Sequence, residues 1–260
     1  MLIDTDPRVQ AHINLFAVLG TLPVLVDRVP AARALLAGTS APVGIRFVIP
    51  GLPRPVLTLD ATGVRWGRER KAPLLTLAFT SITHFNRMID GAAQPIPLAA
   101  PHRLRFLTGV FAPLTDLLGS YLQPTEADLA DPEFRETSII LTLHVTAAAL
   151  AQVANEDRSG RFSAHHIPDG DIALEITGAL AYHLQLRGHH ATFVAAPSPH
   201  PRGALTFSTL EVTGGILAGD LSAIACMSDG RLAMRGVISM VDNVNRILDR
   251  VGHYLGKSAT

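Results

Sequence analysis

The second half of the chain repeats the first, segment by segment and in the same order, at a spacing of about 130 residues. In each half an apolar segment leads into a capped helical stretch, a glycine, a second apolar segment, another glycine and an amphipathic helix. The paired positions are Leu75–Leu77 with Leu205–Phe207, Gly91 with Gly219, Gly109 with Gly236, and Tyr121-Leu122 with Tyr254-Leu255. The identities are weak, so the shared order carries the prediction. We expect two domains of the same topology, residues 1–125 and 126–260, joined within residues 123–136.

Alternating apolar and polar residues predict a meander of strands in each half. The expected strands are 45–49, 56–60, 64–66, 74–79 and 103–107 in the first half, and 171–176, 181–186, 192–195, 205–207 and 231–234 in the second. Short helices are expected between and after them, whereas residues 157–170 have the composition of a loop. The fold class is therefore α+β: two small domains, each a curved, mostly antiparallel sheet with short helices on one face.

The stretch Thr137–Asn155 carries no charged residue and opens the second half. A helix that is apolar nearly all round is either a membrane span or a buried core helix. This one contains His144 and Gln152, which lipid would leave without hydrogen-bond partners. We therefore expect a buried helix. A second uncharged stretch, His12–Val26, is short for a span and is interrupted by glycine and proline.

Composition excludes some partners and favours a large apolar core. Lys+Arg and Asp+Glu both number 22, so the formal net charge is zero, which argues against nucleic acid and against a polybasic membrane anchor. Hydrophobic residues make up 48% of the chain and its mean hydropathy is +0.28. Cys226 is the sole cysteine, and the N-terminal residues are acidic rather than basic. These features predict a cytoplasmic protein without stable membrane insertion.

The segment Leu205–Leu255 resembles the sterol carrier protein type 2 family, above all in Leu217–Asp220 and Asp229–Gly236. Looser matches in the first half are Leu57–Trp66, Phe79–Gly91 and Arg103–Leu118. The resemblance implies, as a tandem variant, a curved five-stranded sheet with helices on one face. It also implies an apolar tunnel for sterols, fatty acids, acyl-CoA or other lipids, and no catalytic residue. Pro95-Ile96-Pro97 and Gly214-Gly215 depart from the family pattern.

Inward residues of the expected strands and helices are the candidates for lining such a tunnel, although the same residues could simply fill a packed core. In the first half they are Leu57, Leu59, Leu77, Phe79, Phe85, Met88, Phe106, Phe111 and Leu114. In the second half they are Leu174, Ile176, Phe207, Ile216, Met227, Met234, Met240 and Val244. We expect an elongated cavity in the first domain, between the strand at 56–60 and the helices at 82–89 and 111–118.

Other reactive residue types point to no further chemistry. His189 and His190 would face opposite sides of a strand, and neither they nor His165, His166 and His200 have ligands at zinc-like spacing, so no metal is expected. Cys226 lies in an apolar segment and is interpreted as an inert buried thiol. No nucleophile, phosphate-loop or dinucleotide motif is present. No cofactor and no enzymatic activity are therefore expected.

The sequence thus favours a non-catalytic protein that binds or transfers a lipid, a sterol or a fatty-acyl compound. Two alternatives remain open. The first is an interaction or scaffold protein with collapsed pockets, in which the uncharged helix Thr137–Asn155 mediates docking or a homodimer. The second is an accessory domain that presents a hydrophobic substrate to a partner enzyme.

Overall fold

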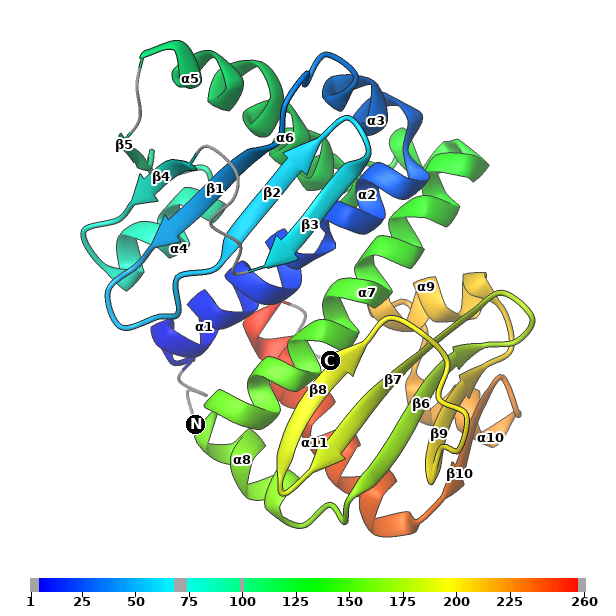
Figure 1. The fold of residues 1–260 in the computed structure, drawn as a ribbon. Coiled ribbons are helices and arrows are strands. Elements are labelled where there is room, and N and C mark those ends of the chain that lie inside the picture. The colour runs from blue at the N-terminus through cyan, green and yellow to red at the C-terminus, as the bar shows by residue number, and fades with distance from the viewer. Residues whose placement is uncertain (1–4, 68–73, 99–100, 257–260) are drawn as a thin grey trace. The chain divides into compact units, whose positions relative to one another are not determined.

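The computed structural model describes residues 5–67, 74–98 and 101–256, which form two compact units with a five-stranded sheet in each (Figure 1). The first unit is residues 18–137, and the second combines residues 1–17 with residues 138–260. Residues 1–4, which entered the localisation argument, lie outside the described part. The N-terminal helix thus belongs with the second sheet. The division of the chain into two domains at residues 1–125 and 126–260 stays a prediction.

In the first unit helices come before, between and after the strands along the chain. Its helical elements are η2 (Leu19–Thr21), α2 (Leu22–Arg28), α3 (Pro30–Leu36), α4 (Ile82–Ile89), α5 (Pro101–Phe106), η3 (Leu107–Phe111), α6 (Ala112–Leu122) and η4 (Asp128–Ala130). Its strands are β1 (Val43–Val48), β2 (Val56–Asp60), β3 (Gly63–Gly67), β4 (Leu74–Ala78) and β5 (Ile96–Leu98). The sheet order is β3-β2-β1-β4-β5, and β1 and β4 run parallel.

The second unit begins with a segment of the N-terminal helix and resumes within α7. Its helical elements are α1 (Pro7–Ile13), most of the π-helical turn η1 (Asn14–Val18), most of α7 (Pro132–Glu156), α8 (Arg158–His165), α9 (Leu210–Ala218), α10 (Ala223–Ser228) and α11 (Ile238–Tyr254). Its strands are β6 (Gly170–Ile176), β7 (Leu180–Arg187), β8 (His190–Val194), β9 (Gly203–Phe207) and β10 (Leu232–Gly236). The sheet order is β10-β9-β6-β7-β8, and β6 and β9 run parallel.

The two sheets have the same connectivity when they are followed from their central strand. In each, the first strand pairs with the second, and the second with the third, in an antiparallel meander. On its other side the first strand pairs in parallel with the fourth. One short helix in the first unit (α4) and two in the second (α9 and α10) then lead to the antiparallel fifth strand at the edge. The structure therefore confirms the α+β fold class with two mostly antiparallel sheets.

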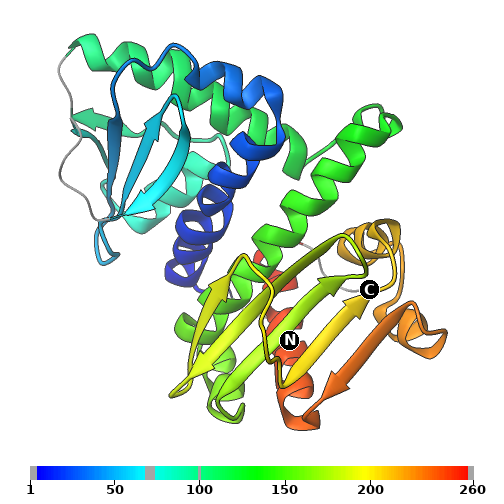
Figure 2. The same cartoon turned by 45° about the vertical axis from the view of Figure 1, so that its right-hand side comes forward.

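Helices cover one face of each sheet, as Figures 1 and 2 show. In the first sheet Ile45 lies between Leu57 and Leu75 in register, and all three side chains are fully buried. On this face the Phe47 and Phe111 rings are 6.3 Å apart, which places η3 over the sheet. In the second sheet His144 of α7 contacts Tyr182 of β7, with ring centroids 5.6 Å apart. The period-two pattern in the sequence therefore identifies the buried faces.

Two segments differ from their predicted structure. Residues 103–107, expected as a strand, lie in the helical run formed by α5 and η3, and the edge position is taken by β5 instead. Five alternating residues are too few to separate a strand from a helix, and Pro101 suits a helix start. Residues 157–170, expected as a loop, contain α8. Its N-cap is Asp157, whose side chain accepts hydrogen bonds from the backbone N–H groups of Ser159 and Gly160.

Both long helices begin in the same way. Asp6 and Asp131 each precede a proline, and each carboxylate accepts a backbone N–H two residues on, at 2.8 and 3.0 Å. The helices Pro7–Arg28 and Pro132–Glu156 are long and apolar enough to cross a membrane by length and composition alone, yet most of each is buried in the protein. Buried core helices meet the same test.

Candidate functional site

Apart from Phe79, which directly follows β4, the candidate lining residues fall on the strands and helices of the two units. Buried candidates are Leu57, Leu59, Leu77, Phe79, Phe85, Phe111, Leu114, Leu174, Ile176, Phe207, Met240 and Val244. Partly buried candidates are Met88, Phe106, Ile216 and Met227, while Met234 is 40% exposed. A packed core and a closed tunnel would bury these residues equally, so burial does not distinguish the two. The prediction that these residues contact a ligand therefore stays a prediction.

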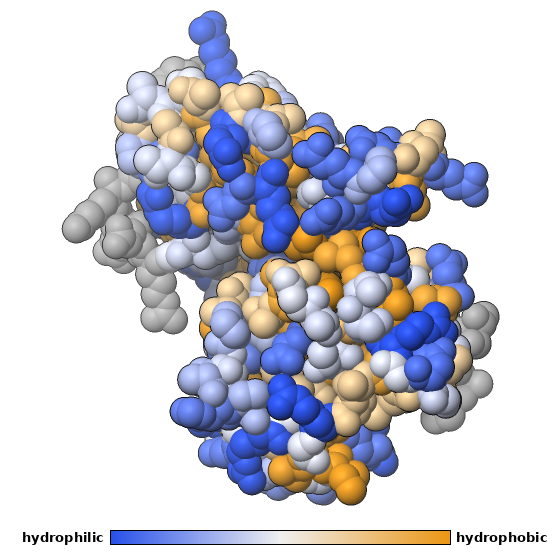
Figure 3. All heavy atoms as spheres, turned by 90° about the vertical axis from the view of Figure 1, so that its right-hand side faces the viewer, coloured by the Kyte–Doolittle hydropathy of each residue, from blue (hydrophilic) through white to orange (hydrophobic). Residues whose placement is uncertain are grey.

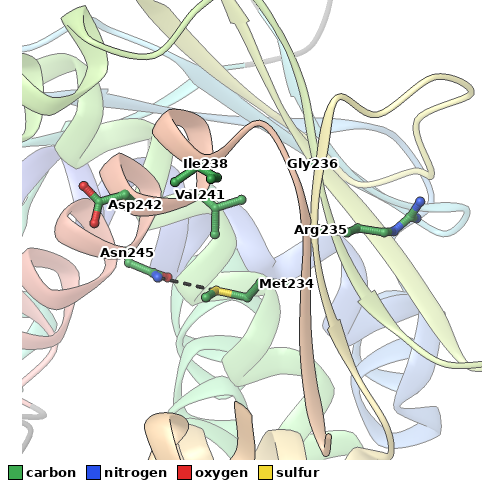
Figure 4. Close-up of a pocket in the computed structure, with 7 residues that line it drawn as sticks. All are labelled: Met234, Arg235, Gly236, Ile238, Val241, Asp242 and Asn245. Atoms are coloured by element: carbon green, nitrogen blue, oxygen red, sulfur yellow. Dashed lines mark hydrogen bonds between the residues drawn. The ribbon is translucent and has the colours of Figure 1, made fainter. Parts of the chain in front are cut away.

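A groove of about 380 Å³ opens between the edge strand β10 and helix α11 of the second unit (Figure 4). It is lined by Met234, Arg235, Gly236, Ile238, Val241, Asp242 and Asn245. Of the candidate residues, the structure places Met234 here. Ile238 and Val241 belong to the helical apolar pattern of the last helix in the sequence. The polar residues at the rim could not be identified as part of a binding site from the sequence, because solvent-facing helix positions are commonly polar.

The groove has an apolar floor and a polar rim. Val241 is buried, whereas Ile238 at the start of α11 is 85% exposed. Asn245 donates from Nδ2 to the Met234 sulfur at 3.5 Å, which holds that flexible side chain across the groove (Figure 4). The Arg235 side chain points away from the other lining residues in the same view, and its guanidinium lies 3.4 Å from the Glu175 carboxylate.

Gly236 permits the turn that separates the two walls of this groove. Its φ is +101°, a region that favours glycine, and an added Cβ would lie 2.1 Å from the Arg202 carbonyl oxygen. The chain therefore passes close to the neighbouring strand and then leaves the sheet for α11. This explains the glycine at the end of β10. The position paired with it in the sequence, Gly109, lies within η3 and not at the end of β5, so that pairing is wrong.

Large apolar side chains reach the surface at the fifth strand of both sheets. Ile96 and Leu98 on β5 are 43% and 59% exposed, in the same topological position as Met234 on β10. Figure 3 views the molecule from the side on which α10 and β10 lie in Figure 1, and apolar side chains there reach the surface among polar ones. Edge strands with exposed apolar side chains are sites of association with a ligand or partner.

The histidines are arranged differently from the sequence expectation. His165 at the end of α8 and His189 in the β7–β8 turn come together, with ring centroids 4.1 Å apart. Tertiary folding alone produces this pair. Among the residues that the structure describes, no three potential metal ligands converge. Cys226 is buried and carries no disulfide.

Three residues with the identities of a catalytic triad meet on the other face of the second sheet, but their geometry differs. The Ser198 hydroxyl donates to Asp171 at 2.7 Å, and the His183 ring lies 3.9 Å from the same carboxylate. His183 is held through Nδ1 by the Ala196 carbonyl oxygen at 2.7 Å. A serine nucleophile needs its hydroxyl on the histidine rather than on the carboxylate. The cluster instead fastens the β8–β9 connection to the sheet.

Asp157 forms a polar cluster in the second unit that the sequence did not reveal. Besides capping α8, its carboxylate accepts hydrogen bonds from Tyr254 and Arg250 at 2.7 and 3.1 Å. Burial alone would raise the pKa of Asp157. Hydrogen bonds from the Gly160 backbone, Tyr254 and Arg250 outweigh it and hold the pKa below its usual value. The cluster ties the C-terminal end of α11, one wall of the groove, to α8.

His144 predicts a pH-dependent stability. Burial lowers its pKa to about 4, against about 6.5 for a histidine in the unfolded chain. Below about pH 6.5 the unfolded chain gains a proton that the folded protein does not, so the free energy of unfolding should fall as the pH drops toward 4. At pH 5 this contribution amounts to about 2 kcal/mol relative to pH 7.

His144→Leu should remove that contribution, so its urea-unfolding free energies at pH 7 and pH 5 should differ less than those of the unmodified protein. His200→Leu, in an exposed loop, is the matched control and should retain the full pH difference. An unchanged pH difference in His144→Leu would contradict the assignment to this residue.

Comparison with solved structures finds proteins that are similar to part of this chain. A sterol carrier protein domain 2 from Helicoverpa armigera is 9% identical, with a TM-score of 0.35, over 43% of this chain and 89% of that one. The ubiquinone synthesis protein UbiJ-SCP2 is 11% identical, with a TM-score of 0.34, over 43% and 96%. A crystal structure of sterol carrier protein 2 is 18% identical, with a TM-score of 0.33, over 44% and 95%. No family model and no curated protein matches the sequence.

Proposed function

We propose that this protein binds a hydrophobic small molecule of the sterol, fatty-acid or acyl-CoA class, without catalysing a reaction, and that its two units are tandem copies of one sterol-carrier-like domain. The observation that carries the proposal is the groove between β10 and α11, where apolar side chains line a hollow at the edge of the covered sheet face. We place the protein in the cytoplasm, where such a carrier would hold a ligand of low solubility.

The size and chemistry of the groove suit the tail of an amphiphile. Its volume of about 380 Å³ lies within the range of small-molecule sites. Each ligand methylene removed from water contributes about 0.8 kcal/mol. Ile238 would lose contact with water at the same time. The Asp242 and Asn245 side chains at the rim can face the polar end of the ligand and the solvent.

The first unit has two features that could contact a ligand of its own. One is the exposed edge strand β5, and the other is the buried indole N–H of Trp66. Trp66 of β3 lies opposite the candidate Leu57 in register, and its indole N–H is buried without a hydrogen-bond partner among the described residues. Buried donors normally have an acceptor, and a ligand hydroxyl or carboxylate would supply one. The elongated cavity expected between β2, α4 and η3–α6 stays a prediction.

Ile238→Asp should abolish tight binding at the groove. The side chain is exposed, so the fold should be retained, but a charge would have to be desolvated beneath an apolar ligand. Displacement of a fluorescent fatty acid from the full chain should weaken by about ten-fold or more, the equivalent of about 1.4 kcal/mol. Ile224→Asp is the matched control, because Ile224 is an exposed isoleucine on α10 that does not line the groove. It should bind like the unmodified protein.

The competing functions make different predictions for the same variants. If the unmodified protein binds no fatty acid or sterol and Ile238→Asp instead breaks up a homodimer, the scaffold function holds and the carrier function is wrong. If Ile238→Asp and its control bind the ligand equally well, the ligand does not occupy this groove. An accessory protein that presents a substrate to a partner enzyme would also bind the ligand. It differs from a carrier because it would release the ligand only to that enzyme.

A further inference from the structure

A second hollow, of about 740 Å³, lies at the opposite edge of the second sheet from the β10–α11 groove. Its walls are α8, the end of α7, the β7–β8 turn and Asp6, which precedes α1. Four histidines, His165, His166, His189 and His190, surround it together with Arg158 and Arg161. The hollow therefore gathers side-chain N–H donors from two elements of the second unit, and Asp6 and Glu156 line it as well.

The two arginines of this hollow have unused hydrogen-bonding capacity. Arg158 and Arg161 are exposed, and neither guanidinium has a hydrogen bond or ion pair among the described residues. The acids of the hollow are engaged elsewhere: Asp6 caps α1, and Glu156 lies 3.8 Å from the His12 ring. The guanidinium groups are therefore available to an external anion, for which arginine offers a planar, bidentate donor.

The geometry of the hollow favours an anion between its walls. His165 and His189 face each other with ring centroids 4.1 Å apart, so imidazole N–H donors from α8 and from the β7–β8 turn come to the same place. The turn that presents His189 is fixed, because Gly188 and His189 both have positive φ, 54° and 66°, and Asp169 accepts the Gly188 N–H at 2.9 Å. At the rim, Phe162 is 66% exposed on α8 and can pack against an organic group.

We propose that this hollow binds the phosphate group of a phosphorylated ligand that also carries an apolar or planar body. The arginines pair with the phosphate oxygens, the histidine N–H groups donate to them, and Phe162 packs against the body of the ligand. The shared chemistry fits both a soluble phosphate ester and a phospholipid headgroup. This site is separate from the β10–α11 groove, so it stands or falls independently of the proposed function.

The test is titration of the full-length protein with inorganic phosphate and pyrophosphate, followed through the histidine imidazole resonances. Phosphate should shift the His165 and His189 signals, and pyrophosphate should bind more tightly. The double variant Arg158→Gln/Arg161→Gln should weaken binding by about ten-fold or more, since the loss of even one charge-assisted hydrogen bond has an effect of about that size. The control Arg231→Gln/Arg246→Gln removes two exposed arginines elsewhere in the same unit and should change binding less than two-fold.

Two further binding experiments distinguish a lipid headgroup from a soluble phosphate ester, and a Zn²⁺ titration tests for a metal site. Binding to phosphatidic acid vesicles but not to phosphatidylcholine vesicles supports a lipid headgroup, whereas displacement of pyrophosphate by adenosine monophosphate without vesicle binding supports a soluble ester. The proposal is overturned if phosphate and pyrophosphate shift no histidine signal, or if the double variant and its control bind equally. It is also overturned if the imidazoles respond to Zn²⁺ alone, since the pair would then be a metal site.

Discussion

Asp157→Ala should lower the free energy of unfolding by about 3–5 kcal/mol, the range found when one partner of a buried, hydrogen-bonded ion pair is removed. The Asp157 side chain is almost fully buried, and the side chain of its partner Arg250 is mostly so. The substitution would remove the carboxylate that accepts hydrogen bonds from Arg250 and Tyr254, and it would also remove the cap of α8. Urea unfolding of the full chain is the measurement.

The matched control is Asp242→Ala, which removes an exposed carboxylate from the same helix as Arg250. Asp242 pairs with Arg246 one turn away at 3.2 Å, and such surface pairs contribute about 0.3–0.5 kcal/mol. A loss of less than about 1 kcal/mol in Asp157→Ala would show that the cluster is not the principal tie between α8 and α11.

The Asp157 cluster should make the free energy of unfolding fall at both low and high pH. The pKa of Asp157 is lowered in the folded protein, so its contribution is present above about pH 4 and is lost as the pH falls through the folded value. Burial, aided by the hydrogen bond to Asp157, raises the pKa of Tyr254 to about 12. The contribution of Tyr254 is therefore lost as the pH rises above about 10 toward 12. Because α11 forms one wall of the groove, weakening this cluster should also weaken ligand binding there.

The sheets could be predicted from the sequence because their alternation is long enough and agrees with its surroundings. The strand expected at 171–176 has buried residues on one face and turn residues on both sides, and the structure has β6 there. Residues 103–107 show the limit of the same argument. Their alternation is short, and the helical run that follows Pro101 includes them. Local pattern alone could not decide between the two structures.

The candidate sites depend more strongly on tertiary structure. Helical periodicity placed Val241 on the buried side of the last helix, but no pattern in the sequence indicates that Ile238 would be left exposed at its start. The pair formed by His165 and His189 joins two elements whose proximity follows from the docking of α8 beside the β7–β8 turn. A single sequence contains the residue types of such a site but not their distances.

Glycines in helices were the features most easily misinterpreted. Gly214 and Gly215 depart from the family pattern, and by helix propensity each glycine costs about 1 kcal/mol relative to alanine. In the structure a Cβ at Gly214 would lie 2.6 Å from the Ile139 side chain, and one at Gly215 would lie 2.7 Å from Leu221. The glycines allow α9 to approach its neighbours closely. The same is true of Gly160 in α8, a helix that lies where the polar composition of residues 157–170 indicated a loop.

Gly160→Ala should therefore destabilise the protein although alanine is the better helix former. An added Cβ would lie 2.1 Å from the Val153 carbonyl oxygen, a backbone atom that cannot move without disturbing α7. We expect a loss of about 3 kcal/mol from overpacking. Gly119→Ala is the control, because Gly119 is an exposed glycine in α6 with no atom within 4 Å of an added Cβ. That variant should gain about 0.5–1 kcal/mol. Opposite signs in thermal or urea unfolding would confirm that α8 packs directly on α7, whereas a gain in both variants would contradict that packing.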